Sequence, residues 1–485
     1  MITLKDPSLL KQQAYVNGQW IDALNGETNP VLNPATGEQI ATVPDLGAAE
    51  TEAAIEAANI AQQSWKKKTA KERSVLLRKW FELIVENKDD LAILMTAEQG
   101  KPVAESAGEV MYGASFIEWY AEEGKRAYGD VIPTHAADKR IIVTKEPIGV
   151  TAAITPWNFP NAMITRKCAP ALAVGCTMII KPAEDTPLSA LALMELADRA
   201  GIPAGVISVV TTKRPIEVGK TLTDSPIVRK LSFTGSTPVG KQLMRQCADT
   251  VKKTSMELGG NAPLIIFDDA DLDKVIPAAI ASKYRNSGQT CVCANRLLVQ
   301  SGIYEEFAKR YAAEVEKMNV GNCLEGDYQQ GPMINRAAVE KVTAMVEDAV
   351  EKGARVISGG KPHELGGNFY EPTIVADVTA DMRLASEEIF GPVAPLFRFE
   401  TEEEAVAMAN DTEYGLAAYF FTRDYARVIR VSEGLEYGMV AVNEGILSTE
   451  VAPFGGIKES GTGREGSKYG MDDYLEIKYT LMGGL

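Results

Sequence analysis

The chain has 485 residues and a formal net charge of −16, with 45% hydrophobic and 24% charged residues. This length predicts two or three domains, and the composition is that of a globular protein. The acidic balance argues against nucleic acid or an anionic membrane as a partner, and no apolar run is long enough to span a bilayer. The first twenty residues lack the apolar core of a signal peptide, and six cysteines without framework spacing fit a reducing compartment. We therefore expect a cytoplasmic protein.

The predicted elements begin with helix and then alternate. Residues 69–95 carry apolar residues at spacings of three and four, and Thr69 with Glu72 forms a capping box at the start, which predicts a helix. From residue 149 strands and helices alternate, which predicts parallel strands with crossover helices. The predicted strands are 149–155, 177–182, 205–211 and 228–235, and the predicted helices are 161–175, 186–201 and 236–250. A strand at 262–269 and a helix at 271–284 start a second α/β unit.

Two strand-like stretches lie outside these units, at 139–147 and 473–480. A strand with an open edge needs a partner. We expect these two strands to pair with each other and with another subunit, which predicts a homodimer or homotetramer.

Cys291 and Cys293 stand one residue apart in "YRNSGQTCVCANR". The pair could be a metal knuckle, a disulfide, a nucleophile or two buried thiols. With only two histidines in the chain and no second close cysteine pair, we expect no metal site. If Cys291 is a nucleophile, the scarcity of histidine means that its base is a carboxylate, a lysine or water.

Two further polar residues are candidates for catalysis. Glu257 lies between Met256 and Leu258, apolar neighbours that could raise its pKa toward that of a useful base. Asn158 follows the first strand of the α/β unit, where such sheets bind ligands, and its amide could donate to an oxyanion. The alternatives are a solvated glutamate at a strand end and a simple strand-to-helix turn.

Seven segments, in order, resemble the aldehyde dehydrogenase superfamily, and the resemblance covers nearly the whole chain. They are "PWNFP", "KPAEDTP", "FTGSTPVG", "MELGGNAP", "NSGQTCVCAN", "EEIFGP" and "PFGGIKESGTGREG". Within the superfamily, "FIEWYAEEGKR", "NFPNAMITRKCAPALA" and "EGSKYGMDDYLEIKY" are most similar to the succinate-semialdehyde dehydrogenase branch.

The resemblance implies an α/β fold with a Rossmann-type cofactor domain, an α/β catalytic domain and a β oligomerisation arm. We assign residues 1–128 and 148–257 to the NAD(P)-binding domain and residues 258–441 to the catalytic domain. Residues 129–147 and 442–485 are assigned to the oligomerisation arm and C-terminal segment.

The resemblance also implies a reaction, the NAD(P)-dependent oxidation of succinic semialdehyde to succinate. Cys291 would attack the aldehyde carbon, with the oxyanion held by the Asn158 amide and the Cys291 backbone N–H. Hydride transfer to the nicotinamide would leave a thioester, and water activated by Glu257 would hydrolyse it. The alternatives are a glutarate-semialdehyde dehydrogenase, a CoA-acylating enzyme and a non-catalytic protein on the same scaffold, with ester hydrolysis as a side activity of the thiol.

The only GxGxxG motif in the sequence is "GTGREG" at 461–466. We do not expect it to bind the cofactor, because no strand precedes it and no βαβ unit surrounds it. Glu184 could accept hydrogen bonds from both ribose hydroxyls of NAD and repel a 2′-phosphate, so we expect NAD to be preferred over NADP, although Lys181 could hold the phosphate. The residues expected at the cofactor are Thr155, Trp157, Lys181, Glu184, Gly235, Ser236, Leu258, Glu388 and Phe390.

A semialdehyde with a free carboxylate needs a cation at the far end of its pocket. Arg166 and Arg285 lie near the two catalytic segments, and Ser448 matches a third carboxylate contact in this branch. For each arginine the alternative is a surface salt bridge.

Cys293 has two interpretations. It is a small buried thiol, or it forms a strained, easily reduced disulfide with Cys291 that switches the enzyme off reversibly. The other cysteines, Cys168, Cys176, Cys247 and Cys323, are expected to be packing residues.

Overall fold

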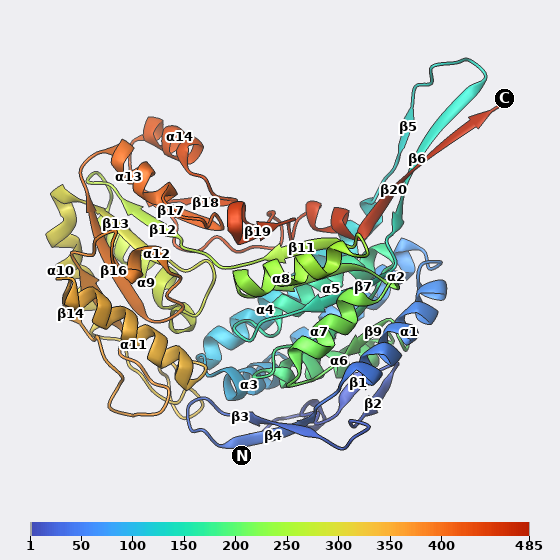
Figure 1. Ribbon diagram of the computed structural model, residues 1–485, viewed down its shortest axis with the longest axis horizontal. Helices are drawn as coiled ribbons and strands as arrows, with labels where there is room; N and C mark the ends of the chain where they lie inside the picture. Colours follow the sequence, from blue (N-terminus) through green and yellow to red (C-terminus); the bar gives the residue numbers. More distant parts are fainter. Residues whose placement is uncertain (1, 485) are drawn as a thin grey trace.

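The computed structural model describes residues 2–484 (Figure 1). Two large sheets lie side by side, and a third, three-stranded sheet projects away from them with the C-terminus at its tip (Figure 1). The eight-stranded sheet has the order β19(Gly461–Thr462), β11(Lys253–Glu257), β10(Val228–Thr234), β7(Val150–Ile154), β8(Thr177–Lys181), β9(Ile207–Val209), β1(Ala14–Val16), β2(Gln19–Ile21). The seven-stranded sheet has the order β14(Arg355–Ser358), β15(Thr373–Ala376), β16(Val393–Phe399), β13(Arg296–Gln300), β12(Pro263–Ile266), β17(Ala417–Phe421), β18(Met439–Val442).

Helices pack around both sheets. Those around the first sheet are α1(Ala48–Trp65), α2(Ala70–Glu86), α3(Lys88–Gln99), α4(Val103–Glu123), α5(Ala162–Val174), α6(Pro187–Ala200), α7(Pro215–Asp224) and α8(Thr237–Ala248). Those around the second sheet are α9(Leu272–Tyr284), α10(Tyr304–Val315), α11(Arg336–Glu351), α12(Arg383–Ser386), α13(Glu402–Asn410) and α14(Tyr425–Gly434). Within residues 2–484, no helix combines the length and apolar character needed to cross a membrane.

The alternation predicted from residue 149 is confirmed. The five central strands β7 to β11 of the eight-stranded sheet are parallel. β7 lies between β8 and β10. From β7 the chain continues outward through β8 and β9 on one side, and then returns to form β10 and β11 on the other side. Ligands of α/β sheets bind at the carboxyl ends of the strands where the order reverses. The loops after β7 and β10, which hold Asn158 and Gly235, therefore meet at the place where a nucleotide is expected.

The helix predicted over 69–95 is two helices. The capping box at Thr69 is present, since the Thr69 N–H donates to Glu72 Oε2 at 2.7 Å. At Asn87 the backbone leaves helical geometry, with φ −98° and ψ 15°, and the Asn87 side chain donates to the Leu83 carbonyl at 2.8 Å. An asparagine amide competes with the helix for its own carbonyls, and here the competition ends α2 and lets α3 start in a new direction.

The projecting sheet has the order β20(Leu475–Gly483), β6(Lys139–Pro147), β5(Asp130–Ile132). β20 and β6 pair antiparallel along their whole length, as predicted for the two isolated strands. Ile477 on β20 is 73% exposed and Val131 on β5 is 80% exposed. The fourth sheet is the pair β3(Thr28–Leu32) and β4(Gln39–Pro44) near the N-terminus.

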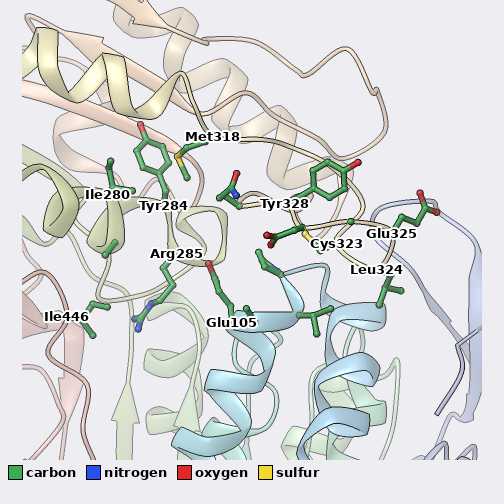
Figure 2. Close-up of a pocket in the computed structure, with 17 residues that line it drawn as sticks. Glu105, Ile280, Tyr284, Arg285, Met318, Cys323, Leu324, Glu325, Tyr328 and Ile446 are labelled. Atoms are coloured by element: carbon green, nitrogen blue, oxygen red, sulfur yellow. The ribbon is translucent and has the colours of Figure 1, made fainter. Parts of the chain in front are cut away.

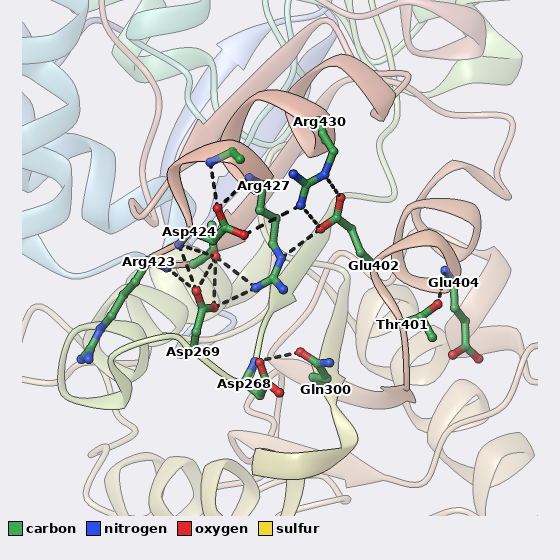
Figure 3. A network of polar contacts seen from close by, with 12 residues as sticks. Asp268, Asp269, Gln300, Thr401, Glu402, Glu404, Arg423, Asp424, Arg427 and Arg430 are labelled. Atoms are coloured by element: carbon green, nitrogen blue, oxygen red, sulfur yellow. Dashed lines mark hydrogen bonds and ion pairs between the residues drawn. The ribbon is translucent and has the colours of Figure 1, made fainter.

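A network of charges joins the helices beside β17 to the loop after β12 (Figure 3). Arg427 donates to Asp269 at 3.1 Å and to Glu402 at 3.0 Å, and its guanidinium lies 4.4 Å from the centre of the Phe267 ring. The acidic run "DADLDK" at 269–274 divides between this network and the start of α9. Asp271 caps α9, whereas Asp269 belongs to this network.

Candidate active site

Two cavities meet at Cys291. One, of about 280 Å³, is lined by α4, α5 and the segment before β13, and it contains all three predicted substrate residues, Arg166, Arg285 and Ser448. The other, of about 260 Å³, opens at the switch point of the eight-stranded sheet and contains Asn158. Cys291 lines both, so a group bound in either cavity can reach its sulfur.

Asn158 is buried in the middle of the loop between β7 and α5. Its side-chain Nδ2 donates to the Gln289 carbonyl at 3.0 Å, which places the amide beside the segment that carries Cys291. Its own backbone carbonyl accepts from Asn286 Nδ2 at 3.0 Å. Asn158, whose amide is predicted to bind an oxyanion, is thus joined by two hydrogen bonds to the loop that carries Cys291, one through its amide and one through its backbone carbonyl.

The loop that leads to Cys291 has an unusual backbone. Asn286 and Ser287 have φ of 52° and 53°, and Gly288 follows with φ of 71°. A Cβ on Gly288 would lie 2.2 Å from the Gly391 carbonyl oxygen, so only glycine fits there. Left-handed conformations in residues other than glycine are costly and cluster at functional sites, which supports a functional role for this loop.

Glu257 ends β11 and is 2% exposed, so the alternative of a solvated glutamate is wrong. Burial and the nearby Glu465 raise the pKa of Glu257 well above its usual value. One carboxylate oxygen of Glu257 has no hydrogen-bond partner, and the other lies against Gly455. In this position Glu257 lines neither cavity, so base catalysis requires its side chain to rotate toward Cys291.

A buried charge cluster behind Glu257 was not predicted from the sequence. Glu465 forms ion pairs with both Arg166 and Lys167 on α5. Burial opposes the charge on Glu465, but Arg166 and Lys167 lower its pKa below the usual value. The sequence does contain one indication of this cluster, since Arg166 and Lys167 are adjacent cations in an otherwise apolar helix. A buried cation needs a carboxylate partner, so the pair predicts a buried acidic residue nearby.

Glu465 belongs to the "GTGREG" segment. Gly461–Thr462 form β19, an edge strand antiparallel to β11, and a 3₁₀ helix at Tyr469–Tyr474 follows. This is not the strand–turn–helix of a dinucleotide loop, which agrees with the prediction that the motif is a false match. The segment instead supplies the counter-charge for Arg166.

Two arginine side chains line the cavity of about 280 Å³. Arg166 is buried over the Phe454 ring at 4.1 Å, and its Nη2 has no hydrogen-bond partner within the described residues. Arg285 stands over the Phe159 ring at 5.6 Å. No hydrogen bond or ion pair of the Arg285 side chain is found within residues 2–484, so the alternative of a surface salt bridge does not hold for it. Ser448 lines the same cavity.

A larger cavity of about 810 Å³ adjoins this one (Figure 2). Glu105 and Arg285 line both spaces and form the boundary between them. Its other walls come from α9 and the loop before α11, including Tyr284, Met318 and Tyr328.

The switch-point cavity gathers most of the predicted cofactor residues, namely Trp157, Gly235, Ser236, Leu258, Glu388 and Phe390. Trp157 and Phe390 meet edge to face, with ring centres 5.5 Å apart, and Phe390 has a left-handed φ of 55°. Glu388 accepts from the Gly260 N–H at 2.9 Å, and burial raises its pKa to about 7. Ser236 caps α8 without a side-chain hydrogen bond, so the first N–H groups of that helix remain available to an anion.

The remaining predicted cofactor residues lie beside this cavity. The Thr155 hydroxyl is buried and has no hydrogen-bond partner among residues 2–484. Lys181 ends β8, the strand next to β7, and its ammonium pairs with Glu184 at 2.7 Å. Glu184 is about one-third exposed, which leaves it accessible to a ligand.

Cys293 lines neither cavity. It is buried, its sulfur donates to the Gly288 carbonyl at 3.3 Å, and the Lys283 ammonium is 3.8 Å away. All six cysteines are free thiols. A disulfide with Cys291 requires the left-handed loop to rearrange, and the redox switch stays a prediction. No group of three or more potential metal ligands occurs within residues 2–484.

Burial raises the pKa of the Cys291 thiol to about 12, although Arg166 opposes this shift. The thiolate fraction of Cys291 therefore rises with pH. The raised pKa of Glu257 acts in the same direction on kcat, because that carboxyl must be ionised to act as a base in deacylation, which follows the steps that kcat/KM reports. A cationic nicotinamide ring bound beside the sulfur would lower the pKa of Cys291. The rise of the thiolate fraction would then occur at lower pH, but the fraction would still rise with pH.

We expect kcat/KM for the aldehyde, measured at saturating cofactor, to rise from about pH 6 to about pH 9, with a limiting slope of about one in the logarithmic plot. The check is a steady-state pH profile at constant ionic strength. A flat profile over that range would show that ionisation of Cys291 does not limit thioester formation.

A Rossmann-like sheet with a cavity at its switch point, beside a second α/β sheet, is the architecture of a dinucleotide-dependent oxidoreductase. The sequence model of the Aldehyde dehydrogenase family matches residues 20–480. The chain therefore belongs to the aldehyde dehydrogenase family.

Several relatives are similar over their full lengths. The chain is 64% identical over 482 residues to a glutarate-semialdehyde dehydrogenase of Pseudomonas aeruginosa, covering 99% of this chain and 100% of the relative. It is 63% identical over 480 residues to an NADP(+) succinate-semialdehyde dehydrogenase of Escherichia coli, covering 99% of each. It is also 63% identical over 485 residues, all of both chains, to a 3-sulfolactaldehyde dehydrogenase of Pseudomonas putida. A crystal structure of succinate-semialdehyde dehydrogenase from Burkholderia pseudomallei matches with a TM-score of 0.98 at 60% identity, covering 99% of this chain and 100% of that one.

Proposed function

We propose that this aldehyde dehydrogenase oxidises succinic semialdehyde to succinate. The observation that carries the proposal is the free guanidinium of Arg285, with the unpartnered Nη2 of Arg166, in the cavity that ends at Cys291. A short aldehyde with a terminal carboxylate would bind its anion to these groups and present its other end to the sulfur. The names of the relatives support this, because each describes an aldehyde that also carries an acidic group.

In the proposed reaction the Cys291 thiolate attacks the aldehyde carbon, and the Asn158 amide and the Cys291 backbone N–H stabilise the oxyanion. NAD(P) supplies the hydride acceptor when it is bound. Collapse of the oxyanion then leaves a thioester on Cys291. Glu257 rotates toward the thioester, removes a proton from water and so releases the carboxylate product.

The residues present fit a dinucleotide. The buried Thr155 hydroxyl lacks a partner, and the N-terminus of α8 offers free N–H groups. A Cβ on Gly259 would lie 3.2 Å from Glu388 Oε2 and 3.3 Å from Thr237 Oγ1, so a side chain there would narrow the cavity. We assign Trp157 and Ser236 to the phosphates, Lys181 and Glu184 to the adenosine ribose, and Leu258, Glu388 and Phe390 to the nicotinamide half.

We also propose that NAD is preferred over NADP. Glu184 pairs with Lys181, a cation that could hold a 2′-phosphate, and adds a negative charge where that phosphate would lie. The Glu184→Ser variant should release Lys181 and raise kcat/KM for NADP relative to NAD by about tenfold or more, the scale of one charged hydrogen bond. Parallel kinetics of both enzymes with both cofactors measure this ratio. A wild-type enzyme that already favours NADP would overturn the assignment of Glu184.

The function is tested by steady-state kinetics with a panel of aldehydes that contains succinic semialdehyde, glutaric semialdehyde, 3-sulfolactaldehyde and butanal. We expect succinic semialdehyde to have the highest kcat/KM. Glutaric semialdehyde is the second candidate, since one methylene changes binding by only about 1–3 kcal/mol. A preference for butanal would contradict the proposal, and no turnover of any aldehyde would favour a non-catalytic role.

We further propose that the protein is a cytoplasmic homodimer or homotetramer. The projecting sheet supports assembly, because exposed apolar side chains such as Ile477 and Tyr479 lie along its strands. The six free thiols support a reducing compartment.

A further inference from the structure

A buried ion pair on α4 has no part in the reaction proposed above. Lys101, just before the helix, and Glu109, two turns inside it, have side chains only 1% exposed, and their charges are 2.5 Å apart. Burying two charges costs more than an exposed ion pair returns. The pair is therefore expected to serve something besides stability.

Both members reach the loop that carries Asn158. The Lys101 ammonium donates to the Asn158 backbone carbonyl at 2.6 Å and lies 4.0 Å from the centre of the Phe159 ring. Glu109 Oε1 accepts from the N–H groups of Asn161 at 2.9 Å and Ala162 at 3.1 Å. The pair thus holds both ends of residues 158–162 against α4.

The same helix also holds the nucleophile's loop. Glu105 Oε2 accepts from the Asn286 N–H at 2.8 Å, and the Asn286 amide donates to the same Asn158 carbonyl that Lys101 binds. Glu105 and Glu109 are one turn apart on one face of α4. The start of this helix therefore sets the spacing between the loop of Asn158 and the loop of Cys291.

We propose that Lys101 is a positioning residue for the oxyanion-binding amide of Asn158, with Glu109 as its counter-charge. Lys101 fixes the backbone of Asn158, so that the side-chain amide can donate to the oxyanion when it forms on the carbon bound to Cys291. This inference rests on the proposed roles of Asn158 and Cys291. A displacement of about 1 Å in such a group can cost about a hundredfold in rate.

The test is a double-mutant cycle on kcat, with Lys101→Met, Asn158→Ala and the double variant. Lys101→Met should lower kcat about 10- to 100-fold while KM changes less than about threefold, because the bond matters when the oxyanion forms. In the Asn158→Ala background the same change should cause no further loss of kcat. Lys252→Met is the matched control, because Lys252 is also buried and donates to a backbone carbonyl, that of Val228 at 2.8 Å, but lines neither cavity.

A second variant guards against simple misfolding. Lys101→Met with Glu109→Gln leaves no uncompensated buried charge, so it should fold and keep the low kcat of Lys101→Met. Recovery of wild-type kcat in this variant would overturn the proposal, because charge balance alone would then explain the defect. Equal kcat in Lys101→Met and Lys252→Met, or losses that multiply with Asn158→Ala, would overturn it as well.

The double-mutant cycle distinguishes a failure of the proposed role of Lys101 from a failure of the proposed reaction. If Asn158→Ala keeps wild-type kcat, the role of Asn158 and the positioning role of Lys101 both fail. If Asn158→Ala loses kcat and Lys101→Met does not, only the positioning role fails.

Discussion

Replacing Glu257 by glutamine should give an enzyme that reduces about one equivalent of cofactor per active site and then nearly stops. The change keeps the shape of a residue that is 2% exposed, so the fold should persist. It removes the proposed base for deacylation, whose contribution is about 10²- to 10⁴-fold. Cys291 and Asn158 remain, so the thioester should still form. A stopped-flow trace of NADH absorbance measures the burst and the following steady rate.

Glu98→Gln is the matched control for this experiment. Glu98 is another buried carboxylate whose pKa burial raises, to about 8, and it accepts from the N–H groups of Leu188 and Ser189 at the start of α6. It lines neither cavity at Cys291, so its loss should change stability more than turnover. A steady rate in Glu257→Gln equal to that of Glu98→Gln would reject Glu257 as the base.

The second large effect is expected at Arg285. Its guanidinium has no hydrogen-bond or ion-pair partner within the described residues, so Arg285→Met removes a cation without breaking an ion pair. A hydrogen bond to a charged group contributes about 1.5–3 kcal/mol. We therefore expect kcat/KM to fall about 10- to 100-fold for succinic semialdehyde and less than about threefold for butanal.

Arg166→Ala should also lower kcat/KM for succinic semialdehyde, but it is a less specific test. Arg166 neutralises Glu465, so its loss also alters the charges around Glu257. Steady-state kinetics of each variant with both aldehydes give the comparison. Equal losses on succinic semialdehyde and butanal for Arg285→Met would refute a carboxylate clamp.

Much of the fold follows from local patterns. The strands and helices from residue 149 to residue 250 could be predicted because buried parallel strands are short apolar runs and helices here end at glycines such as Gly175 and Gly201. The break at Asn87 was missed, because the apolar spacing of 69–95 continues through it while a single side-chain hydrogen bond ends the helix.

Some residues of the candidate site could likewise be predicted from the sequence, and others could not. Asn158 and Cys291 lie in segments that resemble family motifs, so both could be found in the sequence. Glu465 also lies in such a segment, but no role could be predicted for it or for Lys101, because their partners are hundreds and tens of residues away and only the fold brings them together. Their importance comes from burial, which the sequence around each of them does not reveal.

The central claim is that Cys291 carries the acyl group and that Glu257 releases it. The most direct measurement is peptide mapping by mass spectrometry of Glu257→Gln after mixing with cofactor and succinic semialdehyde. The account predicts a succinyl thioester on the peptide that contains Cys291, located on Cys291 itself and absent from Cys291→Ser/Glu257→Gln. A modification on Cys293 instead, or an unmodified peptide after a full burst of NADH, would contradict it.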